Sequence, residues 1–502
     1  MPASLALLLA LPLALFTATG LDAHAAAPAG APSHASTSLH WPDTEAARHA
    51  RAWFTAFNEG EAAMRAVYQE HYSPEAMATR PIDGRLERYR EMRSNEGTLT
   101  PVAVPEVNED GIQVVARTAD GRTLTLDFEC EPESPHRIRG IRVTAGGEGS
   151  GGRGVGRGAG PAPAGPPLGD EAAVQAIRDI VARAAQADSF SGAVLLARDG
   201  KPLLRQAWNR AERRAGTPNR PETRFNLGSI NKIFTKVAIA QLAQRGRLTL
   251  DDPLTRWLPD WPGAAAAKIT IAMLAGHRAG IGDIFGPRYQ ATDRSKLRHN
   301  RDFIPLFRDQ PLWFEPGTSE RYSNGSYVLL GEIIAKASGK DYYDYMRDHV
   351  WGPAGMTATA YLAIDDSAGD VAMGYTRGED SRDALSENVS SRPARGGAAG
   401  GGYSTLDDML RFDQALLANR LCAPGWTAWV LGGPPPPDIQ AAAAPGGGGE
   451  KPGFGFAGGA PGISAEHMHE GALTLIVLGN FDPPYTQEVT RQLRSILRRM
   501  KD

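Results

Sequence analysis

The stretch that decides the fold is Asn226–Gln244, which reads NLGSINKIFTKVAIAQLAQ. A polar lead-in precedes an apolar run, and this pattern predicts a buried helix that begins at or near Ser229. Lys232 follows one helical turn later on the same face, so the spacing places an amine beside a hydroxyl. A serine hydroxyl becomes a good nucleophile when a base removes its proton, and lysine can be that base once its pKa falls from about 10.4. Taken alone, this spacing also fits an ordinary helix start on the surface.

A second motif lies in residues 315–339, EPGTSERYSNGSYVLLGEIIAKASG, where a polar loop opens into another apolar helix. Tyr322 and Asn324 stand on either side of Ser323 in that loop. A tyrosine phenol can transfer a proton, and an asparagine amide can orient a substrate carbonyl or amide. Together the two motifs supply a nucleophile, a base, a proton carrier and a polar anchor, which favours an enzyme over a simple binding module.

These motifs and three further segments resemble the serine beta-lactamase and penicillin-binding-protein superfamily. The closest resemblance is to its class C-like branch, with family VIII esterases and D-amino-acid peptidases, and it covers about Ala182 to Met500. The segments are GSINKIFTKVAIAQLAQRGRLTLDDPLTRWLPDWP, ITIAMLAGHRAGIGD, FEPGTSERYSNGSYVLLGEII, AAGGGYSTLDDMLRFDQALL and GGAPGISAE. The resemblance implies an α+β fold, in which helices and a helical subdomain flank an antiparallel sheet.

The resemblance also implies a role for each motif residue. Ser229 would be the acylated nucleophile and Lys232 the base that activates it. Tyr322 would relay the proton to the leaving group, and Asn324 would bind the substrate. The oxyanion hole would use the backbone N–H of the nucleophile and a second N–H on Gly459, in the edge strand within residues 455–462, GFAGGAPG.

The third motif of the superfamily normally begins with Lys, His or a similar polar residue, and here the corresponding position is Phe456. Either Phe456 occupies the motif position, or GFGF belongs to the preceding strand and the residues that usually separate it from GGAPG are absent. In both cases the polar group is lost, and a phenyl ring cannot bind a substrate carboxylate. The site should therefore suit neutral acyl groups. Lys451, in the low-complexity stretch 432–453, is better explained as a solvated loop residue than as a substitute.

The residues from 170 onward predict one domain whose sheet is built from both ends of its chain. Asp170 is expected to be the N-cap of a helix. Strands at 191–198 and 201–208 should pair across Asp199-Gly200. Ala472–Leu478 reads as a buried strand and Thr486–Met500 as a cationic helix.

Residues 41–144 predict a smaller α+β domain ahead of it. Apolar residues between Trp53 and Tyr68 recur at helical spacing, with an interruption near Gly60. Strands are expected at 112–116, 123–130 and 138–143. The segment WFTAFNEGEAAMRAVYQEHYSP resembles the opening helices of the nuclear-transport-factor-2-like fold, which implies a cone-shaped accessory domain.

The N-terminus has the pattern of a secretory signal. Ser4–Phe16 is a short apolar run, and Ala23-His24-Ala25 has the small-x-small form of a cleavage site. The run is shorter than the roughly 20 apolar residues of a membrane span. We therefore expect a secreted or periplasmic protein with a signal peptide at 1–25, a tether at 26–40, an accessory domain at 41–144, a Gly/Pro-rich linker at 145–169 and a hydrolase domain at 170–502.

Composition excludes several classes of protein. The 502 residues carry 54 Lys+Arg against 57 Asp+Glu, and this balance lacks the basic patch of a nucleic-acid binder. The two cysteines, Cys130 and Cys422, cannot form a disulfide framework or a CxxC metal site. A single disulfide between them is the alternative to two unlinked buried thiols, which are the expected arrangement. We expect no metal or organic cofactor, no nucleic acid and no membrane span.

Three further candidates have a structural interpretation. His277 in AGHRAGIGD corresponds to a histidine common at a helix end in the superfamily and is taken as structural. His467 and His469 alternate on a strand and could bind a metal as a pair, but a solvated strand face is the simpler reading because no third ligand has a recognisable spacing. Ser464 lacks the second glycine of a nucleophile elbow.

The hypothesis from sequence is a secreted SxxK serine hydrolase that cleaves a small ester, amide or peptide through an acyl-enzyme on Ser229. Esterase activity is preferred, with a D-amino-acid peptidase or a beta-lactamase as alternatives. The rival from another class is a pseudoenzyme, a binding protein of the same fold in which the missing third-motif group has abolished turnover.

Overall fold

The computed structural model describes residues 39, 41–108, 111–119, 123–131, 133–146, 166–366, 369–377, 384–436 and 453–500. The expected signal peptide, nearly all of the tether, most of the linker, and Lys451 lie outside these residues. Among the described residues, no helix combines the length and the apolar character that a bilayer crossing requires.

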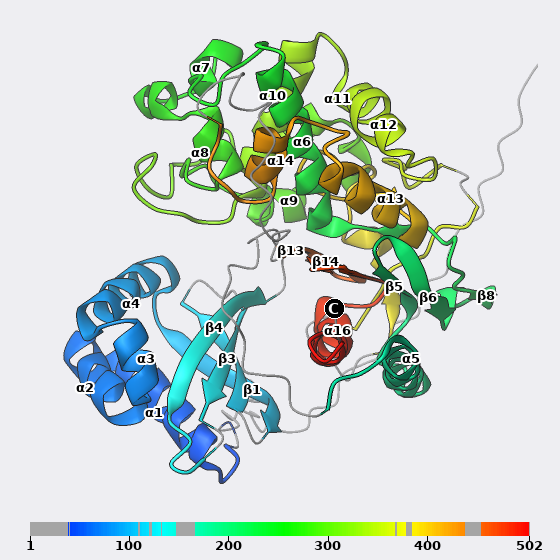
Figure 1. Ribbon diagram of the computed structural model, residues 1–502. Helices are drawn as coiled ribbons and strands as arrows, with labels where there is room; N and C mark the ends of the chain where they lie inside the picture. Colours follow the sequence, from blue (N-terminus) through cyan, green and yellow to red (C-terminus); the bar gives the residue numbers. More distant parts are fainter. Residues whose placement is uncertain are drawn as a thin grey trace, which may run out of the picture.

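The first part of the chain forms four helices followed by a four-stranded antiparallel sheet in the order β1-β2-β3-β4 (Figure 1). This confirms the expected strands and adds β1, which the sequence did not indicate. The elements are α1 (Glu45–Glu59), α2 (Glu61–His71), α3 (Pro74–Thr79), α4 (Ile82–Glu96), β1 (Leu99–Asn108), β2 (Gly111–Thr118), β3 (Thr123–Cys130) and β4 (Ile138–Gly146).

Local sequence explains why these helices begin and end where they do. The Thr44 side chain accepts a hydrogen bond from the Ala47 N–H and caps α1. Gly60, with φ 136°, separates α1 from α2 because most other residues avoid that conformation. The expected interruption near Gly60 is therefore confirmed. Helix α4 is mostly charged and was not expected, but its Leu86 and Tyr89 are buried in the core of this unit.

The larger part of the chain is a helical region joined to a five-stranded sheet, and it also contains three two-stranded sheets within the described residues. Its strands are β5 (Gly192–Arg198), β6 (Lys201–Trp208), β7 (Arg210–Glu212), β8 (Thr217–Pro218), β9 (Phe225–Asn226), β10 (Tyr375–Thr376), β11 (Ser386–Glu387), β12 (Tyr403–Ser404), β13 (Phe454–Ala460), β14 (Ile463–Glu470) and β15 (Leu473–Gly479). Its α-helices are α5 (Asp170–Gln186), α6 (Asn231–Gln244), α7 (Leu254–Trp257), α8 (Ile271–Ala275), α9 (Pro287–Ala291), α10 (Asn324–Ser338), α11 (Tyr342–Tyr345), α12 (Gly352–Ala354), α13 (Leu406–Leu417), α14 (Pro424–Val430) and α16 (Pro483–Leu497).

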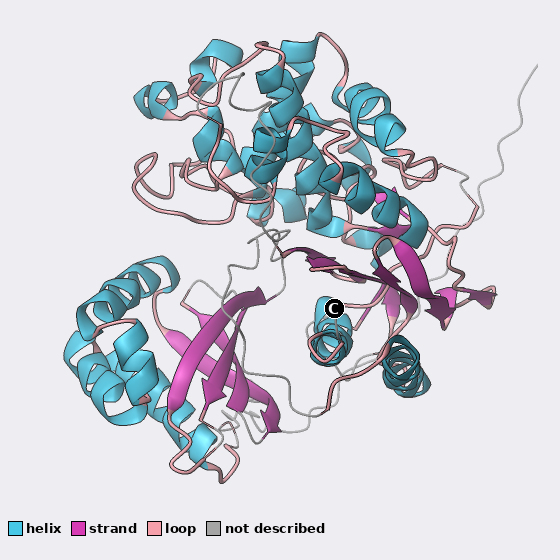
Figure 2. Ribbon diagram, in the orientation of Figure 1, coloured by secondary structure: helices cyan, strands magenta, loops and turns pink. Residues whose placement is uncertain are grey.

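The five-stranded sheet is antiparallel and has the order β13-β14-β15-β5-β6. Strands from the start and the end of this part of the chain therefore lie side by side, as the sequence predicted. Helices α5 and α16 cover one face of the sheet, and the helical region lies against the other (Figures 1 and 2). The expected α+β fold is confirmed, although Gly169 rather than Asp170 is the N-cap residue of α5.

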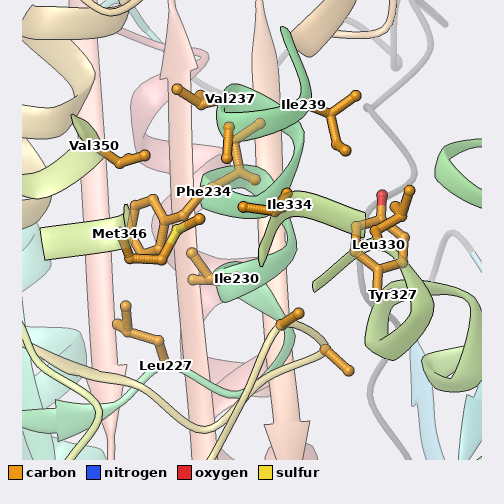
Figure 3. Close-up of a cluster of buried hydrophobic side chains, with 14 of the residues drawn as sticks. Leu227, Ile230, Phe234, Val237, Ile239, Tyr327, Leu330, Ile334, Met346 and Val350 are labelled. Atoms are coloured by element: carbon orange, nitrogen blue, oxygen red, sulfur yellow. The ribbon is translucent and has the colours of Figure 1, made fainter. Parts of the chain in front are cut away.

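Helix α6 runs through the middle of the helical region and is buried almost all round. Its apolar side chains, such as Phe234 and Val237, contact residues of α10 and of the segment Met346–Trp351 (Figure 3). A helix that is buried on every face needs apolar residues all round rather than one stripe. The start of α6, where Ser229 and Lys232 lie, is consequently held rigidly inside the molecule.

Each of the two parts has its own hydrophobic cluster, and this predicts separate responses to mutation. Phe57 is fully buried and stacks on Trp53 at 5.0 Å between ring centroids. We expect Phe57→Ala to destabilise the first part by about 3–5 kcal/mol, seen as a lower first transition in calorimetry of the full chain. Phe234→Ala, in the other cluster, should lower a different transition. If both variants shift one common transition, the two parts do not unfold independently.

Candidate active site

The turn that carries Ser229 connects β9 to α6. Residues Gly228–Ile230 form a 3₁₀ turn, and Gly228 has φ 49° with its N–H bonded to Asn226 Oδ1 at 2.9 Å. The Leu227 N–H bonds to the Gly402 carbonyl at 2.8 Å, which ties the turn to the segment before α13. Ser229 is thereby presented at the N-terminal end of a buried helix, where the helix dipole favours negative charge.

The Lys232 side chain makes three polar contacts, all inside the protein. Its Nζ lies 3.0 Å from Ser229 Oγ, 2.7 Å from Asn324 Oδ1 and 2.6 Å from the Ala399 carbonyl oxygen. Two of these partners are oxygens that can only accept hydrogen bonds, whereas the serine hydroxyl can also donate one. An ammonium would donate one N–H to each of the three oxygens. A neutral amine would donate its two N–H groups to the two carbonyl oxygens and offer its lone pair to the hydroxyl of Ser229.

Burial favours this neutral form of Lys232. Desolvation lowers the pKa of Lys232 from 10.5 to about 7, and the carboxylate of Asp283 acts in the opposite direction. At neutral pH a large share of the molecules therefore carries an uncharged amine beside the serine hydroxyl. That is the protonation state a general base requires.

The second motif brings one side chain to Ser229 and another to Lys232. The Tyr322 hydroxyl donates to Ser229 Oγ at 2.7 Å. Burial raises the pKa of Tyr322 well above its usual value of 10.0, so the phenol keeps its proton at neutral pH. Ser323 caps α10 by accepting the Ser326 N–H, which places Asn324 at the first position of that helix. Four of the predicted site residues, Ser229, Lys232, Tyr322 and Asn324, are thus brought together.

His277 supports the tyrosine of this site from one side. It lies just after α8 with φ 58°, and its Nδ1 accepts the Ser323 N–H at 3.2 Å. Its ring centroid is 4.6 Å from that of Tyr322 and 5.1 Å from that of Tyr327. These contacts agree with the structural interpretation given to His277.

Two groups in the site were not identified from the sequence. The Asp283 carboxylate, in the loop after α8, accepts the Asn324 N–H at 2.9 Å and its side-chain amide at 3.1 Å. The Ala399 carbonyl belongs to the glycine-rich stretch 396–402. Asp283 is the last residue of the quoted segment ITIAMLAGHRAGIGD, so its place within a recognised segment was the available signal. A backbone carbonyl gives no such signal.

The edge strand β13 approaches the serine turn so closely that side chains are excluded there. A Cβ atom on Gly458 would stand 2.0 Å from the Leu227 carbonyl oxygen and 2.7 Å from the Ser229 nitrogen. A Cβ atom on Gly228 would lie 2.9 Å from the Gly459 nitrogen. Gly458 therefore occupies the glycine position of the third motif, and Phe456 stands at its first position.

The register of the hairpin determines where the Gly459 N–H points. Ala460 and Ile463 flank the two-residue turn and pair with each other, and Gly459 is opposite Ser464. In an antiparallel ladder, hydrogen-bonded pairs alternate with non-bonded pairs, so the pair next to the turn-closing one faces its N–H groups outward. Because β13 is at the edge of the sheet, the Gly459 N–H points out of the sheet edge. This orientation is the one an oxyanion donor in this strand needs.

His467 and His469 do not lie on a solvated strand face, and that expectation was wrong. Both are buried, and they contact the two carboxylate oxygens of Asp413 on α13, His467 Nε2 at 3.0 Å and His469 Nδ1 at 3.2 Å. The two histidines hold the pKa of Asp413 well below its usual range, against the effect of burial. Helix α13 covers this face of β14, which the alternation of polar residues could not reveal. Within the described part of the chain, no group of three or more His, Cys, Asp or Glu side chains is arranged to hold a metal ion.

The two cysteines are free, and each is buried in its own part of the chain. Burial raises the pKa of Cys130 to about 12 and that of Cys422 to about 11. Both thiols are therefore unreactive at neutral pH, and the expected arrangement of two unlinked thiols is confirmed.

An antiparallel sheet packed on a buried serine–lysine helix, with a tyrosine and an asparagine from a second helix start, defines the beta-lactamase and transpeptidase class of fold. Residues 175–496 match the family described as Beta-lactamase, and the chain belongs to that family. The family is made up of serine hydrolases, which include beta-lactamases, esterases and peptidases. The N-terminal unit lies outside the matched residues, so its resemblance to the nuclear-transport-factor-2-like fold stays a prediction.

Similar proteins carry several different names. The chain is 36% identical over 34% of its length to Penicillin-binding protein 4* of Bacillus subtilis (strain 168), covering 38% of that protein. It is 32% identical over 45% of its length to Esterase EstB of Burkholderia gladioli, covering 66% of that protein. The first relatives are thus matched over about half of their length or less. The crystal structure of a penicillin-binding protein from Bacillus halodurans covers 64% of this chain and 99% of its own, with a TM-score of 0.56 and 26% identity.

The contact between β13 and the serine turn can be tested by adding a methyl group. We expect Gly458→Ala to destabilise the protein by about 1–3 kcal/mol, because backbone atoms must move apart to admit the new Cβ. Gly453→Ala is the matched control, since its Cβ would lie 3.4 Å from the His469 carbonyl oxygen, at ordinary contact distance. Chemical denaturation of both variants measures the difference. Equal stabilities would show that β13 is not held against the turn.

Proposed function

We propose that this protein is an SxxK serine hydrolase that forms an acyl-enzyme on Ser229, with Lys232 as the general base. The observation that supports this best is the Lys232 amine, 3.0 Å from Ser229 Oγ, with a pKa that burial lowers to about 7. A lysine that only stabilised the fold would have its charge in water or paired with a carboxylate in direct contact.

In the acylation step, neutral Lys232 accepts the hydroxyl proton of Ser229 as Oγ attacks the carbonyl carbon of the substrate. The N–H groups of Ser229 and Gly459 stabilise the oxyanion that develops. Tyr322, whose raised pKa keeps the phenol protonated at neutral pH, then donates its proton to the leaving group and regains a proton from Lys232. Water hydrolyses the acyl-enzyme through the same groups in reverse. Asn324 would contact the substrate.

We propose a small neutral ester as the preferred substrate. Phe456 stands where related enzymes place a polar residue, and its ring neighbours are Phe454 at 5.4 Å and His467 at 6.0 Å. An apolar ring offers no partner for a substrate carboxylate, whereas the backbone donor on Gly459 is independent of the side chain. The name of Esterase EstB, one of the relatives, is in keeping with this choice.

A peptidase or a beta-lactamase is the second candidate, because relatives and solved neighbours carry the names beta-lactamase and D-amino acid amidase. A pseudoenzyme is the third. It is disfavoured because an inert binding protein gains nothing from a neutral buried lysine beside a serine. We further propose that the protein is secreted or periplasmic and that the N-terminal unit is accessory to hydrolysis.

Acylation at Ser229 can be tested by covalent labelling. We expect a fluorophosphonate to label the wild type and Ser229→Ala to lose both labelling and turnover. Lys232→Ala should lower the acylation rate by several orders of magnitude, because serine and base act as one unit. Mass spectrometry of the labelled protein should place the adduct on Ser229. A fluorescent penicillin applied in parallel measures whether an acyl donor that bears a carboxylate also labels the protein. Ser338→Ala, at the end of α10, serves as the control and should label normally.

Labelling of a well-folded Ser229→Ala variant at the wild-type rate would overturn the mechanism. Absence of labelling and of turnover in the folded wild type would favour the pseudoenzyme.

The substrate preference can be tested at Phe456. Leaving a carboxylate unpaired costs several kcal/mol, and each 1.4 kcal/mol is about tenfold in rate. We therefore expect a larger kcat/KM for short-chain p-nitrophenyl esters than for nitrocefin. Phe456→His should narrow this gap, whereas Phe456→Leu, which stays apolar, should leave it wide. A wild type that prefers nitrocefin would refute the neutral-ester hypothesis and would show that another residue supplies the charge.

A further inference from the structure

The Lys232 lone pair is available to Ser229 only if the Asn324 amide faces one particular way. With its oxygen toward Lys232, Asn324 accepts one N–H of the amine at 2.7 Å. If the amide were turned over, its NH₂ group would face the amine and donate to the lysine lone pair. Lys232 could then no longer accept the proton of Ser229. The orientation of one side-chain amide therefore decides whether the base can act.

Asp283 supplies the group that fixes this orientation. Its carboxylate accepts the Asn324 side-chain amide at 3.1 Å from each oxygen and the Asn324 backbone N–H at 2.9 Å. An ionised carboxylate only accepts hydrogen bonds, so the amide must present its NH₂ group to Asp283. The oxygen of the same amide is thereby left for Lys232.

The loop that carries Asp283 is itself anchored. Asp283 Oδ1 also accepts the Phe285 N–H at 3.0 Å, and the Ser323 hydroxyl donates to the neighbouring Gly282 carbonyl at 2.9 Å. A Cβ atom on Gly282 would lie 2.8 Å from Gln310 Oε1. The carboxylate is therefore held in place by its own loop and by the N-terminus of α10.

We propose that Asp283 is a positioning residue of this site, which holds the Asn324 amide with its oxygen toward Lys232 and so keeps the lysine lone pair directed at Ser229. This inference rests on the hydrolytic function proposed above. The hydrogen bonds of Asp283 given above do not include Ser229 or the Lys232 amine, so Asp283 acts through Asn324.

The charge of Asp283 should also affect how kcat/KM depends on pH. Lys232 works as a base when neutral, so kcat/KM of the wild type should rise with pH through about 7. Asp283 raises the pKa of Lys232, and removing its charge should move the rising limb to lower pH. The other titratable groups facing Lys232 are Tyr322 and Tyr327, with the His277 ring packed against both of their rings. All three residues are the same in the wild type and in an Asp283 variant, so a difference between the two pH profiles is due to Asp283.

The test is Asp283→Asn, measured in the full chain by the pH dependence of fluorophosphonate labelling and of ester hydrolysis. The new amide can donate to Asn324 Oδ1 and stabilise the turned-over orientation. We expect kcat to fall by up to about 100-fold, KM to change little, and the rising limb to move to lower pH. Asp251→Asn, at an exposed aspartate, is the matched control and should behave as wild type.

Each outcome is decisive. An unchanged kcat and an unchanged limb overturn the proposal while leaving the Ser229 mechanism intact. A lower kcat with the limb at its wild-type pH indicates structural damage alone and also overturns it. If Asp283→Asn does not fold, Asp283→Glu keeps the charge but displaces it, and a wild-type kcat in that variant would be contrary to the proposal. Lack of Ser229-dependent labelling in the wild type would instead refute the proposed function, and this inference with it.

Discussion

The active site depends on one constraint, which is that the Lys232 amine is buried without a carboxylate in direct contact. Water is excluded by α6 and its neighbours, and burial of an unpaired ammonium is strongly unfavourable. The protein meets this constraint by favouring the uncharged amine and by giving its two N–H groups the carbonyl oxygens of Asn324 and Ala399. The free lone pair and the close serine hydroxyl follow from that arrangement. A solvent-exposed lysine at the same spacing would keep its proton and could not act as a base at neutral pH.

Three segments far apart in the sequence must meet at this point, and glycines make the approach possible. Gly228 precedes the serine, Gly458 lies in the edge strand, and Gly400 belongs to the loop that carries the Ala399 carbonyl. A Cβ atom on Gly400 would stand 3.0 Å from the Gly228 carbonyl oxygen, and one on Gly458 would be closer still to the serine turn. Larger residues would separate the Gly459 N–H from Ser229. The glycine-rich stretch 396–402 therefore contributes to the site.

The two motifs, together with their resemblance to the superfamily, were enough to predict the serine, the lysine, the tyrosine and the asparagine, because each motif leads into a helix with a clear apolar pattern. The sheet assembled from both ends of this part of the chain was predictable because its strands are short apolar runs bounded by turns. Asp283 and Ala399 were not predicted, since they contact Asn324 and Lys232 from loops whose positions depend on tertiary packing. His467 and His469 were misassigned because alternating polar residues indicate one polar strand face but not what covers it. Here α13 covers it and supplies Asp413 as the partner.

His467 and His469, which lie on the strand next to Phe456, do not supply the positive charge that Phe456 lacks. Phe454 and Phe456 pair across the strand with His469 and His467, so the histidines lie directly beside the two rings. Both imidazoles are engaged with Asp413, whose carboxylate also accepts the Thr474 hydroxyl. A charge on either histidine would be balanced by that carboxylate rather than offered to a substrate. The third-motif position is thus lined by phenyl rings whose histidine neighbours are bonded to Asp413. An acyl donor that bears its own carboxylate therefore finds no counter-charge in this part of the described strand.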